Sequence, residues 1–353
     1  MRTTNKIDSL NGIRGFAVLL VLLSHASNEG LNIHPFLNFS GAGRYGVFLF
    51  FVLSAFLLTR QFLDVKPENS EIRTFVTHYF LRRFLRIFPL FTAALMIYFL
   101  LHKIGLSIYP VDGAMFLKSL FLLDAEGIFW TIPVEFQYYF LLPLVALALM
   151  STSRFVFVLT SIALFVVTWW HFIPPDYTTH LLPFLPIFLL GSAAAFISAK
   201  VTGYGALRPS LMGLCNFFAA ISVFLFIVFT PNYYNRLFNE HVGVTAFHKE
   251  FLLFALVSCC LVIFTVHGNG LVKKIMESRI MVFWGNVSFS AYLGHMIVMR
   301  VVGKITYGPE IKWFMFMILT AGFAYLSFKY FELPLSKQST FEKFFTKFKV
   351  KSA

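Results

Sequence analysis

The sequence predicts an all-α polytopic membrane protein of about ten transmembrane helices with both termini in the cytoplasm. Apolar residues make up 58% of the 353 residues and charged residues only 13%, which leaves too little polar surface for a soluble globule. The apolar runs are roughly 20 residues long, whereas the strands of a membrane barrel would alternate with a period of two over about ten residues. The spans are therefore expected to be helices.

Ten apolar segments fit helical spans, and lysine and arginine concentrate in the gaps on one side of them. Because cytoplasmic loops carry the excess of these residues, both termini are expected to be cytoplasmic. Residues 1–336 should form one membrane domain, followed by a basic cytoplasmic tail at 337–353. The three cysteines all lie in apolar spans, so we expect no disulfide and no metal site. The predicted spans are 10–28, 46–63, 88–106, 131–150, 154–173, 181–199, 211–230, 249–268, 285–303 and 313–333.

The first span carries an arginine near one end and a histidine near the other. Arg14 and His25 are eleven residues apart, about three helical turns, so both lie on one face roughly 16 Å apart. An ionisable group in a span usually faces a protein interior or a wet cavity. Arg14 can instead snorkel to lipid phosphates, and His25 can be a hydrogen-bonded packing residue. Their shared face favours a functional groove.

Residues 74–88 mix aromatic side chains with Arg82, Arg83 and Arg86 at helical spacing, and Pro89 follows. This pattern predicts an amphipathic helix on the inner leaflet that stops at the proline. One role for it is anchoring to anionic lipid. The other is a cytoplasmic site for an anionic cofactor with phosphate groups, because arginine forks match phosphate oxygens.

A second polar cluster begins the span at 131–150. Trp130 fits an interfacial aromatic belt, and Glu135 would then lie about 7–8 Å below that belt. A carboxylate inside a membrane normally has a function or pairs with another helix. Tyr138 and Tyr139 follow one turn later, where they can hold the carboxylate or a substrate hydroxyl by hydrogen bonding, or simply pack.

The ninth predicted span carries a third cluster. Ser288, Tyr292 and His295 are spaced by four and three residues, which places them on one helical stripe. A hydrogen-bonded packing network and a chemical role are both open for this stripe. Near the end of the last span, Glu332 is expected to neutralise the arginines of the basic stretch.

Six motifs follow one another along the chain: Arg14-x10-His25 preceded by Asn11-Gly12, FFVLSAFLL at 50–58, LRRFLRIFP at 81–89, FWTIPVEFQYY at 129–139, NVSFSAYLGH at 286–295 and FELP at 331–334. Together, in this order, they resemble the acyltransferase-3 family of membrane acyltransferases. Each motif is weak alone, but the ordered set covers most of the chain. Two positions depart from the family pattern, since Asn11 stands where an aspartate is common and Ala55 replaces the usual glycine.

The resemblance implies a helical bundle that moves an acyl group, most often acetyl, from cytoplasmic acyl-CoA to a hydroxyl of a cell-surface or exported glycan. It implies an essential catalytic role for His25, and for Arg14 a role in donor binding or site organisation. It also marks Trp130, Glu135 and Tyr139 as a second important motif. Some members carry an appended esterase-like domain, and we expect this chain to be the stand-alone form.

The residues and the resemblance suggest one mechanism. The arginines at 14, 82, 83 and 86 would bind the phosphates of acyl-CoA. His25 would deprotonate the acceptor hydroxyl while Glu135 fixes its tautomer and stabilises the imidazolium. An acyl-histidine intermediate is equally compatible with the sequence. Supporting roles at the substrate are expected for Ser54, Trp130, Tyr138, Tyr139, Tyr292 and His295.

A proton-coupled transporter or flippase of a glycan or lipid-linked sugar is the alternative, because intramembrane Arg, His and Glu also suit a proton relay. The sequence has no internal repeat and no pair of broken helices in matching positions, which favours the enzyme. The expected partners are membrane lipid, a glycan acceptor and acyl-CoA, without nucleic acid. The expected location is the inner (plasma) membrane.

Overall fold

The computed structural model describes residues 8–65, 72–106, 108–150, 178–203, 205 and 207–336, and every regular element within these ranges is a helix. The all-α prediction is therefore confirmed for this part of the chain. The longer helices are α1 (Asp8–Asn28), α2 (Gly43–Val65), α3 (Ile72–Lys103), α5 (Thr131–Met150), α7 (Leu185–Gly203), α8 (Pro209–Val228), α10 (Phe251–His267), α13 (Ser288–Gly303) and α14 (Pro309–Ser327). The shorter ones include α4 (Gly113–Leu120), α9 (Pro231–Phe238), α11 (Leu271–Met276), α12 (Arg279–Asn286) and α15 (Leu333–Ser336).

Seven of the described helices are long and apolar enough to cross a membrane, and α10 is a shorter apolar helix. The protein is thus a multi-pass membrane protein. The predicted span 154–173 and the basic tail 337–353 lie outside the described residues, while each of the other predicted spans overlaps a helix. Only 17% of the apolar window of α14 is buried, against 72% for α2. Helix α14 therefore presents its apolar surface to lipid, whereas α2 belongs to the protein core.

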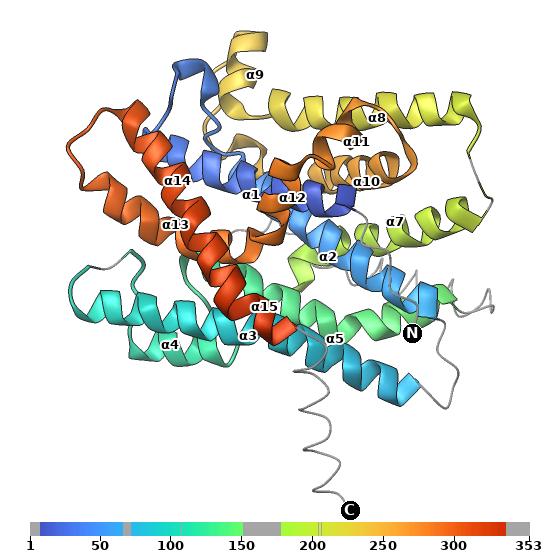
Figure 1. Ribbon diagram of the computed structural model, residues 1–353, viewed down its shortest axis with the longest axis horizontal. Helices are drawn as coiled ribbons and strands as arrows, with labels where there is room; N and C mark the ends of the chain where they lie inside the picture. Colours follow the sequence, from blue (N-terminus) through green and yellow to red (C-terminus); the bar gives the residue numbers. More distant parts are fainter. Residues whose placement is uncertain are drawn as a thin grey trace, which may run out of the picture.

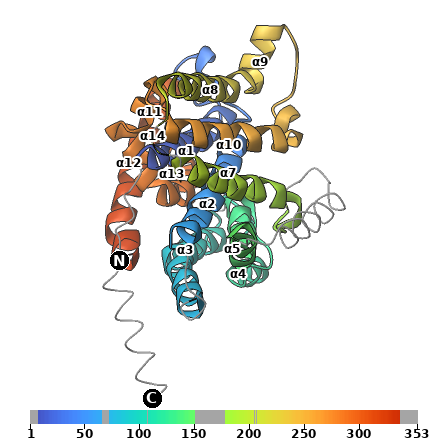
Figure 2. The same ribbon diagram turned by 90° about the vertical axis from the view of Figure 1, so that its right-hand side faces the viewer.

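The central helix of the bundle is α2, which packs against α1, α5, α7 and α10. Figure 1 shows α3, α4 and α5 on one side of the molecule and α8, α10 and α11 on the other, with α1 and α2 between them. The view turned by 90° keeps this order (Figure 2). The last long helix, α14, crosses the bundle at a steep angle and leads to α15 beside α3. Side chains that point from α2 toward its neighbours consequently lie in the interior.

Close packing between α2 and α7 accommodates the alanine that departs from the family pattern. A Cβ added at Gly191 of α7 would lie 2.6 Å from the Val52 carbonyl oxygen and 2.9 Å from the Ala55 Cβ. The small residue that allows two membrane helices to approach is therefore on the partner helix. A substitution at position 55 is tolerated here because Gly191 leaves room for it.

The start of α1 is tied to α12. The Asn11 side chain donates hydrogen bonds to the Val282 carbonyl oxygen at 3.2 Å and to the Asn286 Oδ1 at 2.9 Å. Gly285 sits so close to the Asn11 carbonyl oxygen that no Cβ fits there. Because Arg14 lies about one turn further along α1, this contact fixes the direction in which its side chain leaves the helix.

The predicted amphipathic helix that ends at Pro89 is wrong. Instead, α3 runs unbroken for 32 residues with Pro89 inside it, a length of about 48 Å. The basic stretch and the following span therefore form one helix. This helix is longer than the roughly 30 Å of a hydrocarbon core. Prolines are tolerated in membrane helices because neighbouring groups satisfy the freed backbone atoms. Arg83 and Arg86 lie inside the bundle as a result.

Candidate active site

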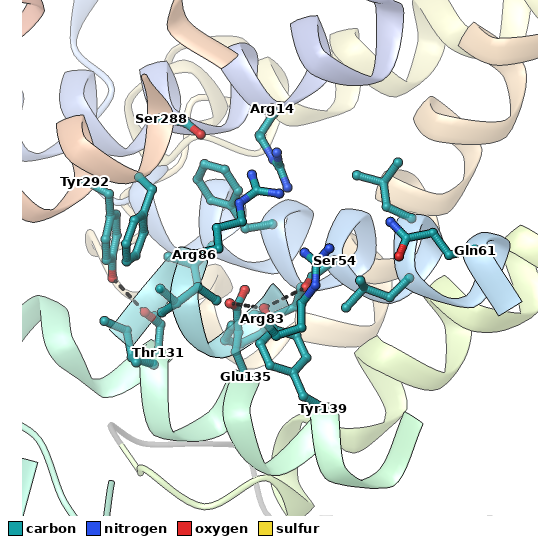
Figure 3. Close-up of a pocket in the computed structure, with 18 residues that line it drawn as sticks. Arg14, Ser54, Gln61, Arg83, Arg86, Thr131, Glu135, Tyr139, Ser288 and Tyr292 are labelled. Carbon is teal, nitrogen blue, oxygen red and sulfur yellow. Dashed lines mark hydrogen bonds between the residues drawn. The ribbon is translucent and has the colours of Figure 1, made fainter. Parts of the chain in front are cut away.

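A cavity of about 270 Å³ lies between α1, α2, α3, α5 and the start of α13. This volume is close to the lower end of the range of about 300–1,000 Å³ typical of small-molecule sites. One wall is apolar and comes mostly from α2. The polar lining residues come from all five helices, α2 included, and are Arg14, Ser54, Gln61, Arg83, Arg86, Thr131, Glu135, Tyr139, Ser288 and Tyr292. Figure 3 shows these side chains around the cavity.

Three arginines from two helices share this cavity. Arg14 comes from α1, and Arg83 and Arg86 come from α3; Figure 3 shows all three pointing into the same space. Within the part of the chain that the structure describes, none of them forms an ion pair, and the Arg83 Nε is buried without a hydrogen-bond partner. Glu135 is the one acidic residue of the lining. The cavity thus carries an excess of two positive charges, which suits an anionic ligand.

The fourth arginine of the predicted donor site does not join this group. Arg82 is exposed and does not line the cavity. On a helix, position 86 lies in angle between positions 82 and 83, about 40° from position 82 and about 60° from position 83, and positions 82 and 83 are about 100° apart. The cavity lies on the side of α3 that carries Arg83, away from Arg82. The predicted grouping of Arg82 with Arg83 and Arg86 is therefore not formed at this cavity.

A chain of hydroxyl groups holds the carboxylate. The Tyr139 hydroxyl donates to Glu135 Oε2 at 2.8 Å, and the Ser54 Oγ lies 3.2 Å from the same hydroxyl. Because the tyrosine proton is used toward Glu135, Ser54 is the donor in the second bond. The Tyr79 hydroxyl also donates to the Tyr139 backbone carbonyl at 3.2 Å. Glu135 is accordingly fixed from α2 and α5, close to the charges of the three arginines.

Tyr138 faces the opposite way. Its side chain is fully buried, and its hydroxyl lies 2.6 Å from Ser192 Oγ in the contact with α7. It does not line the cavity. Of the two roles left open for Tyr138, its contacts are those of packing, and it does not share the cavity with Tyr139.

Trp130 is buried in the protein core. Only 7% of the Trp130 surface is exposed, and its ring lies 5.0 Å from that of Phe184 and 5.9 Å from that of Phe51. The Arg44 guanidinium approaches the indole at 5.9 Å. The chain therefore enters α5 inside the bundle, and Glu135, little more than one turn further on, lines the same cavity as Arg14.

His25 lies at another level of the bundle. A Cβ added at Gly43, the first residue of α2, would be 3.5 Å from the His25 Cδ2. Ser54, which is joined to Glu135 through Tyr139, follows eleven residues later on α2, or roughly 16 Å along the axis. The predicted pairing of His25 with Glu135 is therefore wrong. The His25 Nδ1 lies 3.0 Å from the Met296 Sδ and 3.4 Å from the His295 Nε2.

Tyr292 connects the cavity to this histidine pair. It lines the cavity, its hydroxyl donates to the Ile128 carbonyl at 2.7 Å, and Thr131 donates to that hydroxyl at 3.3 Å. Its ring centroid is 6.0 Å from that of His295. In Figure 3, Tyr292 and Gln61 stand at opposite ends of the group of labelled side chains. One end of the cavity thus adjoins the two histidines.

Glu332 has a different partner from the one expected. It accepts hydrogen bonds from the Ser290 backbone N–H at 3.1 Å and from the Ser290 hydroxyl. Since Ser290 is in the first turn of α13, the buried carboxylate caps that helix. The expected pairing with the basic stretch of α3 is not formed by hydrogen bonds, although Arg86 is near enough to act on the carboxylate electrostatically.

The profile of the family described as Acyltransferase domain, Acyl_transf_3, matches residues 7–329. This chain belongs to the acyltransferase-3 family. It is similar to the O-acetyltransferase OatA of Staphylococcus aureus strain NCTC 8325, with 23% identity over 377 residues, 96% of this chain and 58% of that protein. It is also similar to a protein of strain COL named as a candidate O-acetyltransferase, with 24% identity over 373 residues, 94% of this chain and 58% of that protein.

This acyltransferase-3 chain spans somewhat more than half the length of the curated relatives it matches. No solved structure matches it. The family match covers every residue of the cavity and the histidine pair.

Three residues at this acyltransferase-3 site were not found from the sequence. Gln61 lies seven residues after Ser54, two turns along the same face of α2, so its spacing was a usable signal. Thr131 lines the cavity and bonds Tyr292, and its position just after Trp130 gave only a weak signal. Met296 touches His25 through its sulfur, and an apolar residue in an apolar span offers no signal at all.

Proposed function

We propose that the protein is a membrane O-acyltransferase that moves an acyl group, in the first instance acetyl, from acyl-CoA to a hydroxyl of a cell-surface or exported glycan. The observation that carries this proposal is a cavity that holds three arginines without an ion pair to any described residue, with a histidine pair beside its end. Membership of the acyltransferase-3 family and the named O-acetyltransferase relatives support it.

In this proposal the chain crosses the inner (plasma) membrane ten times, with both termini on the cytoplasmic side. The excess of lysine and arginine in the N-terminus, the even-numbered gaps and the tail supports this orientation. Helix α1 then runs outward from Arg14 to His25. The donor enters from the cytoplasm at the arginine level, and the acceptor hydroxyl meets His25 nearer the outer face.

The donor's phosphates would be held by Arg14, Arg83 and Arg86. Guanidinium groups stay charged and form paired hydrogen bonds to phosphate oxygens, and these three have no other ion-pair partner among the described residues. The cavity extends along α2 from Gln61 to Val47, about 21 Å of helix. The extended arm of acyl-CoA would follow this wall, which brings the thioester toward Tyr292 and the histidines.

His25 would then act as the general base. Its imidazole takes the proton of the acceptor hydroxyl while the hydroxyl oxygen attacks the thioester carbonyl carbon. A carbon–oxygen bond forms, the carbon–sulfur bond breaks, and the imidazolium returns the proton to the leaving thiolate. The products are an O-acyl glycan and the CoA thiol. A positioned general base typically contributes a factor of about 10²–10⁴ to the rate.

Thiol release from acetyl-CoA tests the proposal. Purified protein in lipid vesicles is mixed with acetyl-CoA and a panel of cell-envelope glycans, and free thiol is followed together with acetyl groups on the glycan. We expect both products in equal amounts, only with an acceptor, and neither with His25→Ala. Glycan movement across the vesicle without thiol release would favour the transporter and overturn the proposal.

Radiolabelled acetyl-CoA without acceptor separates the two chemical routes. Direct transfer leaves the protein unlabelled. The acyl-histidine route transfers the label from sulfur to the His25 imidazole nitrogen and releases one thiol per protein. Label that is retained by wild-type protein and lost in His25→Ala would replace direct transfer by the two-step route.

A further inference from the structure

Two histidine rings meet beside the cavity. The centroids of His25, from α1, and His295, from α13, are 4.9 Å apart, and the planes meet edge to face at 68°. The His295 Nε2 lies 3.4 Å from the His25 Nδ1. His295 has no exposed surface, so its ring is held in one orientation by the protein around it.

The other nitrogen of His295 fixes the position of its proton. The His295 Nδ1 lies 2.7 Å from the Tyr292 carbonyl oxygen and 3.2 Å from the Ala291 carbonyl oxygen. Carbonyl oxygens only accept hydrogen bonds, so Nδ1 must carry the hydrogen. In a neutral imidazole the second nitrogen is then an acceptor. The Nε2 of His295 therefore presents a lone pair to His25.

The proton of His25 follows from this arrangement. Its Nδ1 faces the lone pair of His295 on one side and the Met296 sulfur, a weak acceptor at 3.0 Å, on the other. Two acceptors at one nitrogen require that this nitrogen be the donor. The lone pair of neutral His25 is then on Nε2, which makes no hydrogen bond to any described residue.

We propose that His295 is a positioning residue that holds the proton of His25 on Nδ1 and so leaves Nε2 free to take the proton of the acceptor hydroxyl. This role rests on the proposed function, and it gives His295 the part that a carboxylate plays in many catalytic triads. Glu135 is excluded from that part because it is bonded to Tyr139 at the level of Arg14. A neutral partner sets the direction of the His25 ring without adding a negative charge.

Two amide variants separate positioning from packing. In His295→Gln the longer side chain places its carbonyl oxygen near the former Nε2, where it can still accept from His25. In His295→Asn the amide reaches only the former Nδ1, so it can bond the Tyr292 carbonyl but not His25. We expect His295→Gln to keep kcat within about tenfold of wild type. For His295→Asn we expect kcat to fall by roughly 10²–10⁴-fold with an unchanged KM for acetyl-CoA. Equal kcat values in the two variants would overturn the proposal.

The tautomer itself is measurable without any turnover. Nitrogen-15 spectra of protein with labelled histidine, with His25 assigned by comparison with His25→Gln, distinguish a protonated from an unprotonated ring nitrogen. We expect hydrogen on the Nδ1 of His25 in wild type and in His295→Gln, and a shift toward the Nε2 form in His295→Asn. Hydrogen on the Nε2 of wild-type His25 overturns the proposal, even if a variant fails to fold. Absence of acetyl transfer by wild type would contradict only the proposed function.

Discussion

Tyr139 donates a 2.8 Å hydrogen bond to Glu135 and thereby keeps the carboxylate on the α5 side of a cavity that also holds three arginines. A free carboxylate in this place would turn toward the guanidinium groups, because opposite charges attract strongly where water is scarce. The tyrosine therefore helps to leave the arginines open for an external anion.

Removal of the Tyr139 hydroxyl should weaken CoA binding. In Tyr139→Phe the carboxylate loses its donor and competes with the CoA phosphates for the arginines. Hydrogen bonds to charged groups contribute about 1.5–3 kcal/mol, so we expect a dissociation constant higher by about tenfold, measured by isothermal titration calorimetry. Tyr138→Phe is the matched control. It removes the bond to Ser192 and should lower stability by about 0.5–1.5 kcal/mol while leaving CoA affinity unchanged. Equal effects on affinity would refute the role of Tyr139.

Neutralising Glu135 should strengthen CoA binding, which is the opposite of the effect expected for Tyr139→Phe. Glu135→Gln removes the single negative charge of the cavity lining, so the three arginines attract an anion more strongly. We expect CoA to bind up to about tenfold tighter. We also expect the ligand-free protein to melt at a lower temperature, because the repulsion among the three arginines is no longer offset by the carboxylate. Glu310→Gln, an exposed position at the start of α14, serves as the control. Weaker CoA binding in Glu135→Gln would mean that the carboxylate contacts the donor directly.

Loss of His25 should separate chemistry from donor binding. His25→Ala is expected to abolish acetyl transfer and to leave the CoA dissociation constant within about twofold of wild type. The reason is that His25 lies roughly 16 Å from the arginine level and does not line the cavity. Parallel assays of thiol release and CoA binding on the same preparation check this expectation. A large loss of CoA affinity would place the phosphates near His25 instead.

The contact between α1 and α12 should tolerate no side chain larger than glycine's hydrogen at position 285. Gly285→Ala directs a methyl group into the Asn11 backbone, and overpacking of this kind costs about 1–3 kcal/mol. Gly213→Ala in α8 has nothing within 4 Å of the new Cβ and should be neutral or slightly stabilising, since alanine favours helices by up to about 1 kcal/mol. Thermal melting in detergent compares the two. A Gly285→Ala protein as stable as Gly213→Ala would show that α12 moves freely.

Helical periodicity predicted what lies along one helix, but not which helices meet. The Arg14–His25 face, the Ser288–Tyr292–His295 stripe and most spans follow from spacing of residues in the sequence. The contacts of Trp130 did not follow from the sequence, because tryptophan prefers interfaces on average, whereas this side chain packs against the rings of Phe51 and Phe184. Pro89 was also predicted from an average preference, because a proline usually ends a helix. Inside the bundle, neighbouring groups satisfy the backbone atoms that the proline leaves without a hydrogen bond, so the helix continues.

The partner of His25 could not have been chosen from the sequence. Glu135 and His295 were both ionisable residues within the membrane, and a carboxylate is the usual partner of a catalytic histidine. The choice depends on how α13 packs against α1, which brings His295 to His25. Similarly, Arg83 lines the cavity and Arg82 does not, and this difference depends on which side of α3 faces the bundle.

The central claim is that the arginine cavity is the donor site, and the CoA dissociation constants of Arg83→Gln and Arg82→Gln test it most directly. These variants lose the same charge at adjacent positions of one helix, but only Arg83 lines the cavity. The account predicts that Arg83→Gln weakens CoA binding at least tenfold, as expected for a charge-assisted contact, and that Arg82→Gln binds CoA as wild type does. Equal affinities in the two variants, whether both normal or both weakened, would contradict the account.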